Sequence, residues 1–384
     1  MRSGWPDRSP PAAAAAIRSW SAPPGCLDCV PSRRTGRCAP CSTKTAVGSS
    51  TCRWPGIPAP SSTSTRPSSW RCWRIFLHAL PESKPIRNVL VATDFSPQAE
   101  AAGRAAADLA GRLGARIHLV HALPVWDPHL DFLAEGAAEA LRAGAEDRLE
   151  REATALGVEG ERLVRPGHPI DVVLESAHRL DADLLVVGTS GRSGLAHFAL
   201  GSVAERIAQS APRDVLLVRE PPAEGFRHPL LALAPGPSGL AAAARAAAVV
   251  PTLDGASLVA VSAYDLPLGF SEAPSGEEEA AERMRERIAA ETEPVREALA
   301  AAIPGFEARF ERGRPCAVVQ AAAERADADL VLLGTRARSR WSALLLGRTA
   351  RSLVHRLPCS VWLVRDLSER HPILDAIARD LGLE

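Results

Sequence analysis

The feature that most constrains the fold of this chain is an internal repeat. Residues 181–189 read DADLLVVGT, and residues 327–335 read DADLVLLGT, 146 positions further on. Neighbouring glycines, prolines and apolar runs match at the same separation without a gap. A unit of this length is a whole domain, because it is long enough to bury a core of its own. We therefore expect two homologous domains, at residues 86–220 and 226–366.

Each unit alternates short aliphatic runs with longer stretches rich in Ala, Leu, Glu and Arg. In the first unit the aliphatic runs lie at residues 89–93, 117–123, 163–165, 184–187 and 215–218. Ser96 followed by Pro97 predicts the start of a helix between the first two runs, and Gly114 predicts its end. Short apolar strands separated by helices indicate a parallel sheet covered on both faces. The predicted fold class is therefore α/β, with two tandem, doubly wound, five-stranded domains.

The overall charge is balanced, with 45 Lys and Arg residues against 45 Asp and Glu residues. This balance argues against nucleic acid as a partner. The sequence contains no apolar stretch of about 18 residues, and its first residues lack the pattern of a secretory signal. We therefore expect a cytoplasmic protein without membrane contact.

Residues 1–85 differ from the rest of the chain. They carry 12 Lys or Arg residues against three acidic residues, and they are rich in Pro and Ser but poor in Val, Leu and Ile. Such a segment buries too little apolar surface to offset the entropy cost of ordering it, so we expect it to be disordered or to be an over-extended gene start. At the other end, residues 367–384 place apolar side chains on one helical face, which predicts a C-terminal helix packed on the second domain.

Two C-x2-C pairs lie within this N-terminal segment. Four thiolates at such spacing can surround a zinc ion, but the loop between the pairs is short and Cys is frequent in this composition. A zinc site and a chance cluster are therefore both open. The four cysteines are Cys26, Cys29, Cys38 and Cys41.

The residues that suggest a ligand site follow the fourth predicted strand. Gly188 and Gly191 begin a loop that ends at Gly201, and Ser202 then opens a helix. Glycine lets the backbone approach a ligand closely, and the first N–H groups of a helix favour an anion. Ligands of open α/β sheets bind beyond the carboxyl ends of the strands. The loop is therefore a candidate phosphate site, although the lysine of a Walker A motif is absent.

With Asp94 at the end of the first strand, this glycine pattern resembles the ATP-binding subclass of the universal stress proteins. The resemblance spans residues 86–366, and it implies the strand order 3-2-1-4-5 in each domain, with ATP across the tips of strands one and four. It implies that the glycines and Ser202 hold ribose and phosphates, that Ser202 also approaches a Mg or Mn ion on the nucleotide, that Asp94 lies near the nucleoside and that Val120 packs on adenine. The residues carried over are Asp94, Val120, Gly188, Gly191, Gly201 and Ser202.

Three of these residues also have a purely structural interpretation. Gly188 can simply end a strand, Asp94 can begin a turn, and Val120 can be a core residue. The assignment of Val120 is the most open of the three, because an apolar strand residue needs no ligand to explain it.

The second repeat departs from the pattern at three positions. Pro235 occupies the position of Asp94, Ala337 replaces the second glycine, and Arg348 replaces Ser202. A methyl group restricts the loop, and a bulky side chain stands where a phosphate or a metal would lie. We therefore expect one competent nucleotide site per chain, in the first domain, and a degenerate site in the second.

The loop has no accompanying general base, no nucleophile with a histidine partner and no carboxylate cluster in the sequence pattern. We therefore assign no catalytic residue and expect a regulatory module that binds ATP. A slow ATPase or phosphotransferase of the same fold and a ligand-free structural dimer are the alternatives. Another adenine nucleotide is also compatible, because backbone N–H groups recognise phosphate rather than the base.

The fifth strands, at residues 215–218 and 361–364, are apolar sheet edges that need a partner. In the universal stress proteins the corresponding strand mediates dimerisation. Two arrangements are open: the two fifth strands pair within one chain as a pseudo-dimer, or they pair between two chains in a homodimer.

Overall fold

The computed structural model describes residues 80–123, 137–189, 200–266, 276–336 and 347–366. Each half of this region supplies five strands. Those of the first half are β1 (Asn88–Ala92), β2 (Arg116–Leu123), β3 (Arg162–Pro166), β4 (Leu184–Gly188) and β5 (Asp214–Val218). Those of the second half are β6 (Pro229–Ala232), β7 (Val259–Tyr264), β8 (Glu307–Arg312), β9 (Leu330–Arg336) and β10 (Ser360–Asp366).

Both halves have the predicted strand order, and the two sheets are joined into one. The order across the ten-stranded sheet is β3-β2-β1-β4-β5-β10-β9-β6-β7-β8, which is 3-2-1-4-5 in each half. Pairing is parallel within each half and antiparallel between β5 and β10. The predicted fold class is confirmed, but the two five-stranded sheets form one continuous sheet because the fifth strands pair within the chain.

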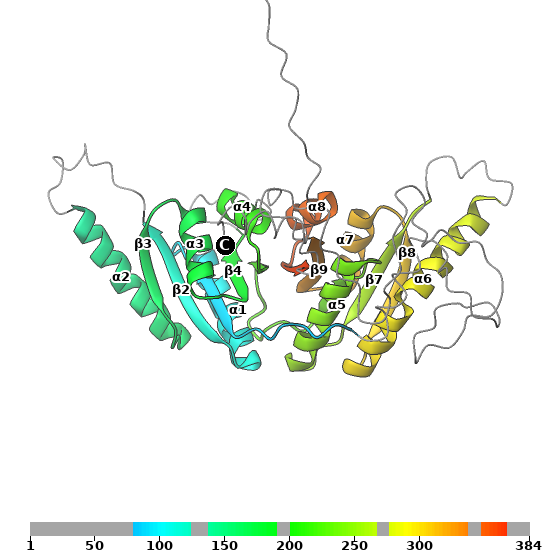
Figure 1. Ribbon diagram of the computed structural model, residues 1–384, viewed down its shortest axis with the longest axis horizontal. Coiled ribbons are helices and arrows are strands. Elements are labelled where there is room, and N and C mark those ends of the chain that lie inside the picture. The colour runs from blue at the N-terminus through cyan, green and yellow to red at the C-terminus, as the bar shows by residue number, and fades with distance from the viewer. Residues whose placement is uncertain (1–79, 124–136, 190–199, 267–275, 337–346, 367–384) are drawn as a thin grey trace, which may run out of the picture. The chain divides into compact units, whose positions relative to one another are not determined.

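Helices cover both faces of this sheet (Figure 1). One face packs against α1 (Pro97–Leu113), α2 (Ala137–Leu156), α5 (Pro237–Val249) and α6 (Glu277–Ala302). The other packs against α3 (Pro169–Arg179), α4 (Ser202–Ser210), α7 (Pro315–Arg325) and α8 (Arg348–Arg356). A 3₁₀ turn, η4 (Val250–Thr252), follows α5. No helix in the described ranges is long and apolar enough to cross a membrane.

The ends of α1 follow the predicted capping signals. The Ser96 side chain accepts a hydrogen bond from the Ala99 N–H at 3.2 Å, and Pro97 is the first residue of the helix. Gly114 adopts φ 64° and returns its N–H to the last turn, which closes the helix in a conformation that glycine allows. The start and the end of this helix are therefore encoded locally.

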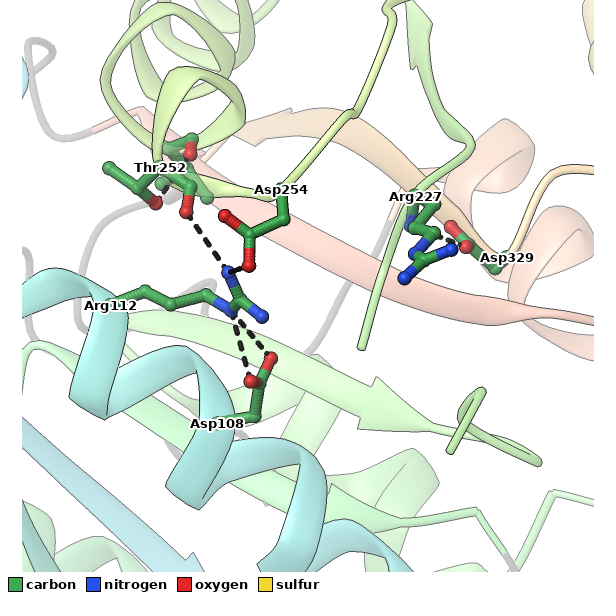
Figure 2. Close-up of polar contacts among 7 residues, drawn as sticks. Asp108, Arg112, Arg227, Thr252, Asp254 and Asp329 are labelled. Atoms are coloured by element: carbon green, nitrogen blue, oxygen red, sulfur yellow. Dashed lines mark hydrogen bonds and ion pairs between the residues drawn. The ribbon is translucent and has the colours of Figure 1, made fainter. Parts of the chain in front are cut away.

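A repeated aspartate fixes the start of the first strand in each half. The Asp183 carboxylate accepts the N–H groups of Arg87 and Asn88 at 2.8 and 3.1 Å, and Asp329 accepts those of Arg227 and His228 at 2.6 and 3.0 Å. Figure 2 shows Asp329 beside Arg227. Burial raises the pKa of Asp183, but hydrogen bonds from Lys84 and the two N–H groups outweigh it and hold that pKa below its ordinary value. The repeated Asp-Ala-Asp motif is therefore a structural device.

The folded region includes residues that the sequence interpretation placed in the N-terminal segment. Leu80 packs on the core, and the Lys84 carbonyl accepts a hydrogen bond from Arg245 of α5 at 2.7 Å. The candidate zinc ligands Cys26, Cys29, Cys38 and Cys41 lie outside the described residues, and so does the helix expected at 367–384.

Candidate functional site

The candidate site lies where β1 and β4 end. These strands are neighbours, with Ala92 opposite Val187, so Asp94 and Gly188 reach the same edge of the sheet. The chain leaves the described region after Thr189 and re-enters it at Leu200, so Gly191 lies outside the described residues. The structure thus brings together the ends of the two strands that the sequence pattern singled out.

Asp94 sits in a tight turn between β1 and α1. Its carboxylate accepts the Ser96 N–H at 3.0 Å, and the Thr93 hydroxyl accepts the Phe95 N–H at 3.0 Å. Thr93 also continues the strand pairing, because its N–H donates to the Val120 carbonyl at 3.0 Å. The turn therefore holds a half-buried carboxylate at the tip of β1, on the edge at which open α/β sheets generally bind their ligands.

Phe95 adopts a strained backbone conformation beside this carboxylate, with φ 62°. Its ring lies 4.2 Å from the His121 ring, and the Arg148 guanidinium lies 4.3 Å from the Phe95 ring centre. The His121 Nδ1 contacts the Thr93 carbonyl at 2.8 Å, so the proton is on Nδ1. Contacts from β2 and α2 therefore hold the turn in place. Phe95 is not among the site residues that the sequence predicts, because nothing in its neighbourhood marks a positive φ at a phenylalanine.

Glu152 of α2 contacts the same turn through Thr93. Its carboxylate accepts a hydrogen bond from the Thr93 hydroxyl at 3.0 Å, while its other oxygen is buried without a hydrogen-bond partner among the described residues. Burial raises the pKa of Glu152 above its ordinary value, since the hydrogen bond from Thr93 only partly compensates. Nothing in the sequence distinguishes this glutamate from other acids on helix surfaces, but its contact with Thr93 makes it a support of the turn.

Val120 is a core residue in this structure. Its side chain is 1% exposed and packs in the cluster that includes Val172 and Val173 of α3. The structure thus agrees with the core interpretation of this side chain, and the adenine contact implied by the resemblance stays a prediction.

The glycines at the end of β4 and the start of α4 have different roles. A Cβ on Gly188 would lie 3.0 Å from the Gln98 carbonyl, so glycine lets the first turn of α1 approach the strand end. The Gly201 N–H donates to the Thr189 carbonyl at 2.6 Å, which joins the two ends of the intervening segment. The Gly201 N–H is therefore used by the protein itself, and any phosphate contact at this helix falls to later N–H groups.

Ser202 is the exposed first residue of α4. Gly201 precedes it in an extended conformation and supplies no side-chain cap. The first intrahelical bond runs from the Glu205 N–H to the Gly201 carbonyl, so the N–H groups of 202–204 have no acceptor within the helix. The positive end of the α4 dipole and a hydroxyl therefore lie at the end of the segment that follows β4.

The second half differs from the first at the same edge. Val89 of β1 and Pro229 of β6 pair with the equivalent residues Leu184 and Leu330. By this register, the residue of the second half that is equivalent to Asp94 is Ala234. The expectation that Pro235 occupies this position is therefore wrong by one residue.

The second strand tip is also packed more tightly. A Cβ on Gly334 would lie 1.7 Å from the Ser238 carbonyl, against 3.0 Å for the equivalent contact of Gly188. Arg348 is the exposed first residue of α8, and Ala337 lies outside the described residues. The second edge therefore lacks the carboxylate and carries a cationic side chain at the helix start. No group of three potential metal ligands occurs in the described part of either half.

The fold defines a class of protein, the duplicated, doubly wound α/β proteins. The model of the universal stress protein family matches residues 85–219 and 225–365. The chain therefore belongs to the universal stress protein family.

Curated relatives match one domain at a time. A universal stress protein of Methanocaldococcus jannaschii is 30% identical over 145 residues, which cover 36% of this chain and 85% of the relative. A universal stress protein of Thermus aquaticus is 37% identical over 138 residues, which cover 35% of this chain and 98% of the relative. A solved structure from Pseudomonas aeruginosa, of a protein whose function is unknown, has a TM-score of 0.55 at 16% identity and covers 78% of this chain and 98% of its own. That likeness spans both halves and shows the fold.

Proposed function

We propose that this chain is an ATP-binding universal stress protein, a regulatory module of the stress response with one nucleotide site, in its first half. The observation that carries the proposal is the juxtaposition at one sheet edge of the Asp94 turn and the strand end that leads to α4. The phosphates bind at the start of α4, Asp94 contacts the nucleoside, and Ser202 lies near a Mg or Mn ion carried by the nucleotide.

The electrostatics of the first half support an anionic ligand. The helix start has three N–H groups without intrahelical acceptors, an exposed hydroxyl and no capping side chain. A phosphate supplies acceptors for those N–H groups, and charge-assisted hydrogen bonds of this type are stronger than neutral ones. Because this recognition is of phosphate, the choice of adenine over another base depends on contacts to the nucleoside.

The second half supports the limit of one site per chain. Ala234 offers no carboxylate where Asp94 stands, and Arg348 replaces the small hydroxyl of Ser202. The tight contact between Gly334 and α5 leaves less room at the strand tip. The second half thus contributes structure rather than a nucleotide site.

The module binds without turnover in this proposal, and it acts in the cytoplasm. The two cysteines in the described residues, Cys316 and Cys359, are free thiols, as expected in a reducing compartment. Slow ATP hydrolysis is the competing function, and phosphate release measured alongside binding distinguishes the two.

A reciprocal exchange at the two helix starts tests the proposal. Calorimetric titration of the full chain with Mg-ATP should give one site. Ser202→Arg places the second half's residue in the first half and should weaken binding at least about tenfold, which is about 1.4 kcal/mol. The matched control Arg348→Ser should leave the affinity unchanged. Two equivalent sites, or equal effects of the two exchanges, would contradict the proposal.

Asp94→Asn separates the charge from the turn. The amide oxygen still accepts the Ser96 N–H, so the turn is retained while the carboxylate charge is lost. Weaker binding with an unchanged thermal midpoint is expected. Release of phosphate at a steady rate by the original chain, abolished in Ser202→Arg, would instead establish the ATPase.

A further inference from the structure

The two halves meet where β5 and β10 pair. Leu216 lies opposite Trp362, flanked by Val215 opposite Leu363 and Leu217 opposite Val361. Because the halves are homologous, the same edge of a second chain offers the same backbone hydrogen bonds. The side chains at this junction therefore decide whether a half pairs with its neighbour or with a copy of itself.

Part of the junction is the same on both sides. The Arg219 guanidinium of the first half donates to the Val354 carbonyl, and the equivalent Arg365 donates to the equivalent Ala208 carbonyl. These two arginines are buried, and each crosses to the opposite half. Such contacts fix the geometry but do not distinguish one half from the other.

The central pair distinguishes them by size. Leu216 and Trp362 occupy equivalent positions in the repeat, face each other across the strand pair and are both fully buried in one cluster. Two first halves would place Leu opposite Leu and leave a void, whereas two second halves would place Trp opposite Trp in a filled core. Both changes are costly in close-packed interiors.

A buried carboxylate distinguishes them by charge. Asp214 of β5 accepts hydrogen bonds from the Arg245 guanidinium at 2.9 Å, the Trp362 indole at 3.2 Å and the Arg365 N–H at 2.9 Å, all from the second half. The equivalent of Asp214 is Ser360, and in the strand register the equivalent of Arg245 is Ala105. Two first halves would therefore bury two carboxylates without the ion pair that Arg245 supplies, which is unfavourable.

Two ion pairs nearer the surface also distinguish the mixed pair from the like pairs. Glu205 of α4 pairs with Arg351 of α8 at 3.0 Å, and these residues are equivalent in the repeat. Arg112 of α1 donates to its own equivalent, the Thr252 carbonyl, at 3.5 Å and pairs with Asp254 at 2.7 Å (Figure 2). Like halves would place Glu against Glu, and Arg against Arg, where the chain has attractive contacts.

We propose that the fifth-strand surface of each half is specific for the opposite half of the same chain and rejects a second copy of itself. Size at the central pair, the buried Asp214 and the Glu205–Arg351 contact all favour the mixed pair over both like pairs. The two unlike halves of the chain therefore pair with each other, and the β5 and β10 edges are both occupied by this pairing. This inference does not depend on nucleotide binding.

The test lets the halves of the full chain choose partners. A protease site inserted between the exposed residues Ala223 and Glu224 is cut in the folded protein, and the cut protein is unfolded in urea, refolded and analysed by native mass spectrometry. Mixed pairs of one N-terminal and one C-terminal fragment are expected, and pairs of two identical fragments are not. Like pairs in comparable amounts would overturn the proposal, and so would fragments that stay single.

A charge exchange supplies the matched control. Glu205→Arg or Arg351→Glu alone should lower the share of mixed pairs, because each places like charges at the contact. The double exchange restores an Arg–Glu contact in the reverse order and should restore the mixed pairs. An equal loss in the single and double variants would show that this contact carries no selectivity and overturn its part in the proposal.

Discussion

The buried ion pair between Asp214 and Arg245 gives a quantitative test of how the halves are held together. The two side chains are 6% and 9% exposed, and the distance between them is 2.9 Å. The protein also contains a natural reference, since Ser360 and Ala105 stand at the equivalent positions. Replacing the ion pair by Asp214→Ser and Arg245→Ala copies one side of the junction onto the other.

The magnitude follows from burial. Removing one member of a buried ion pair leaves an uncompensated charge and costs about 3–5 kcal/mol, so Asp214→Ser and Arg245→Ala should each lower the unfolding free energy by that amount. The double variant removes both members of the ion pair together, so the remaining loss is of hydrogen bonds and packing, at about 2–3 kcal/mol. The sum of the single effects is about 6–10 kcal/mol, so the coupling should be at least about 3 kcal/mol.

Urea unfolding of the full chain at pH 7, followed by far-ultraviolet circular dichroism, measures these differences. Ser360→Ala is the control on the equivalent side. It removes one hydroxyl that bonds the Arg219 N–H at 3.0 Å and the Arg219 carbonyl at 3.1 Å, and it should cost about 1 kcal/mol. Additive single effects, or an Asp214→Ser variant as mild as Ser360→Ala, would refute the reasoning.

Three further predictions concern stability. Gly334→Ala should lower the thermal midpoint far more than Gly188→Ala, because the added Cβ meets a carbonyl at 1.7 Å in the first case and 3.0 Å in the second; equal midpoints in differential scanning calorimetry would contradict this. Burial lowers the pKa of His118, so the unfolded chain takes up its proton first and stability should fall as the pH drops below about 6.5; His118→Asn should flatten this dependence in urea titrations at several pH values. The pKa of Asp183 is held below its ordinary value, so its contribution is present at neutral pH and lost as the pH falls through the lowered pKa; Asp183→Asn should therefore be less stable than the original chain at pH 7, and a difference that did not shrink towards pH 3 would count against this assignment.

The sequence was most informative where the signal is local. Ser96, Pro97 and Gly114 marked the ends of α1, because a cap acts on the residues next to it. The repeat and the alternation of strands and helices predicted the strand order of both halves through the family resemblance. The same patterns placed Asp94 and Gly188 at one edge of the sheet, since the ends of neighbouring parallel strands meet there.

Errors and omissions arose where the decisive contact is distant in sequence. The register of β6 moved the equivalent of Asp94 from Pro235 to Ala234, because the chain between β1 and β4 is shorter than the chain between β6 and β9. Phe95 takes a positive φ that nothing in its neighbourhood announces, and contacts from His121 and Arg148 accompany it. These features depend on packing between elements rather than on propensity.

The sequence by itself determined that this protein has two homologous α/β halves, where the first helix begins and ends, and which strand ends carry the candidate ligand residues. Only the tertiary structure decided that β5 and β10 join the halves in one sheet and that Asp214 meets Arg245 and Leu216 meets Trp362. The physical reason is the range of the forces involved. Periodicity and capping act within a few residues, whereas the choice of partner depends on the volume and charge of side chains that only folding brings together from the two halves.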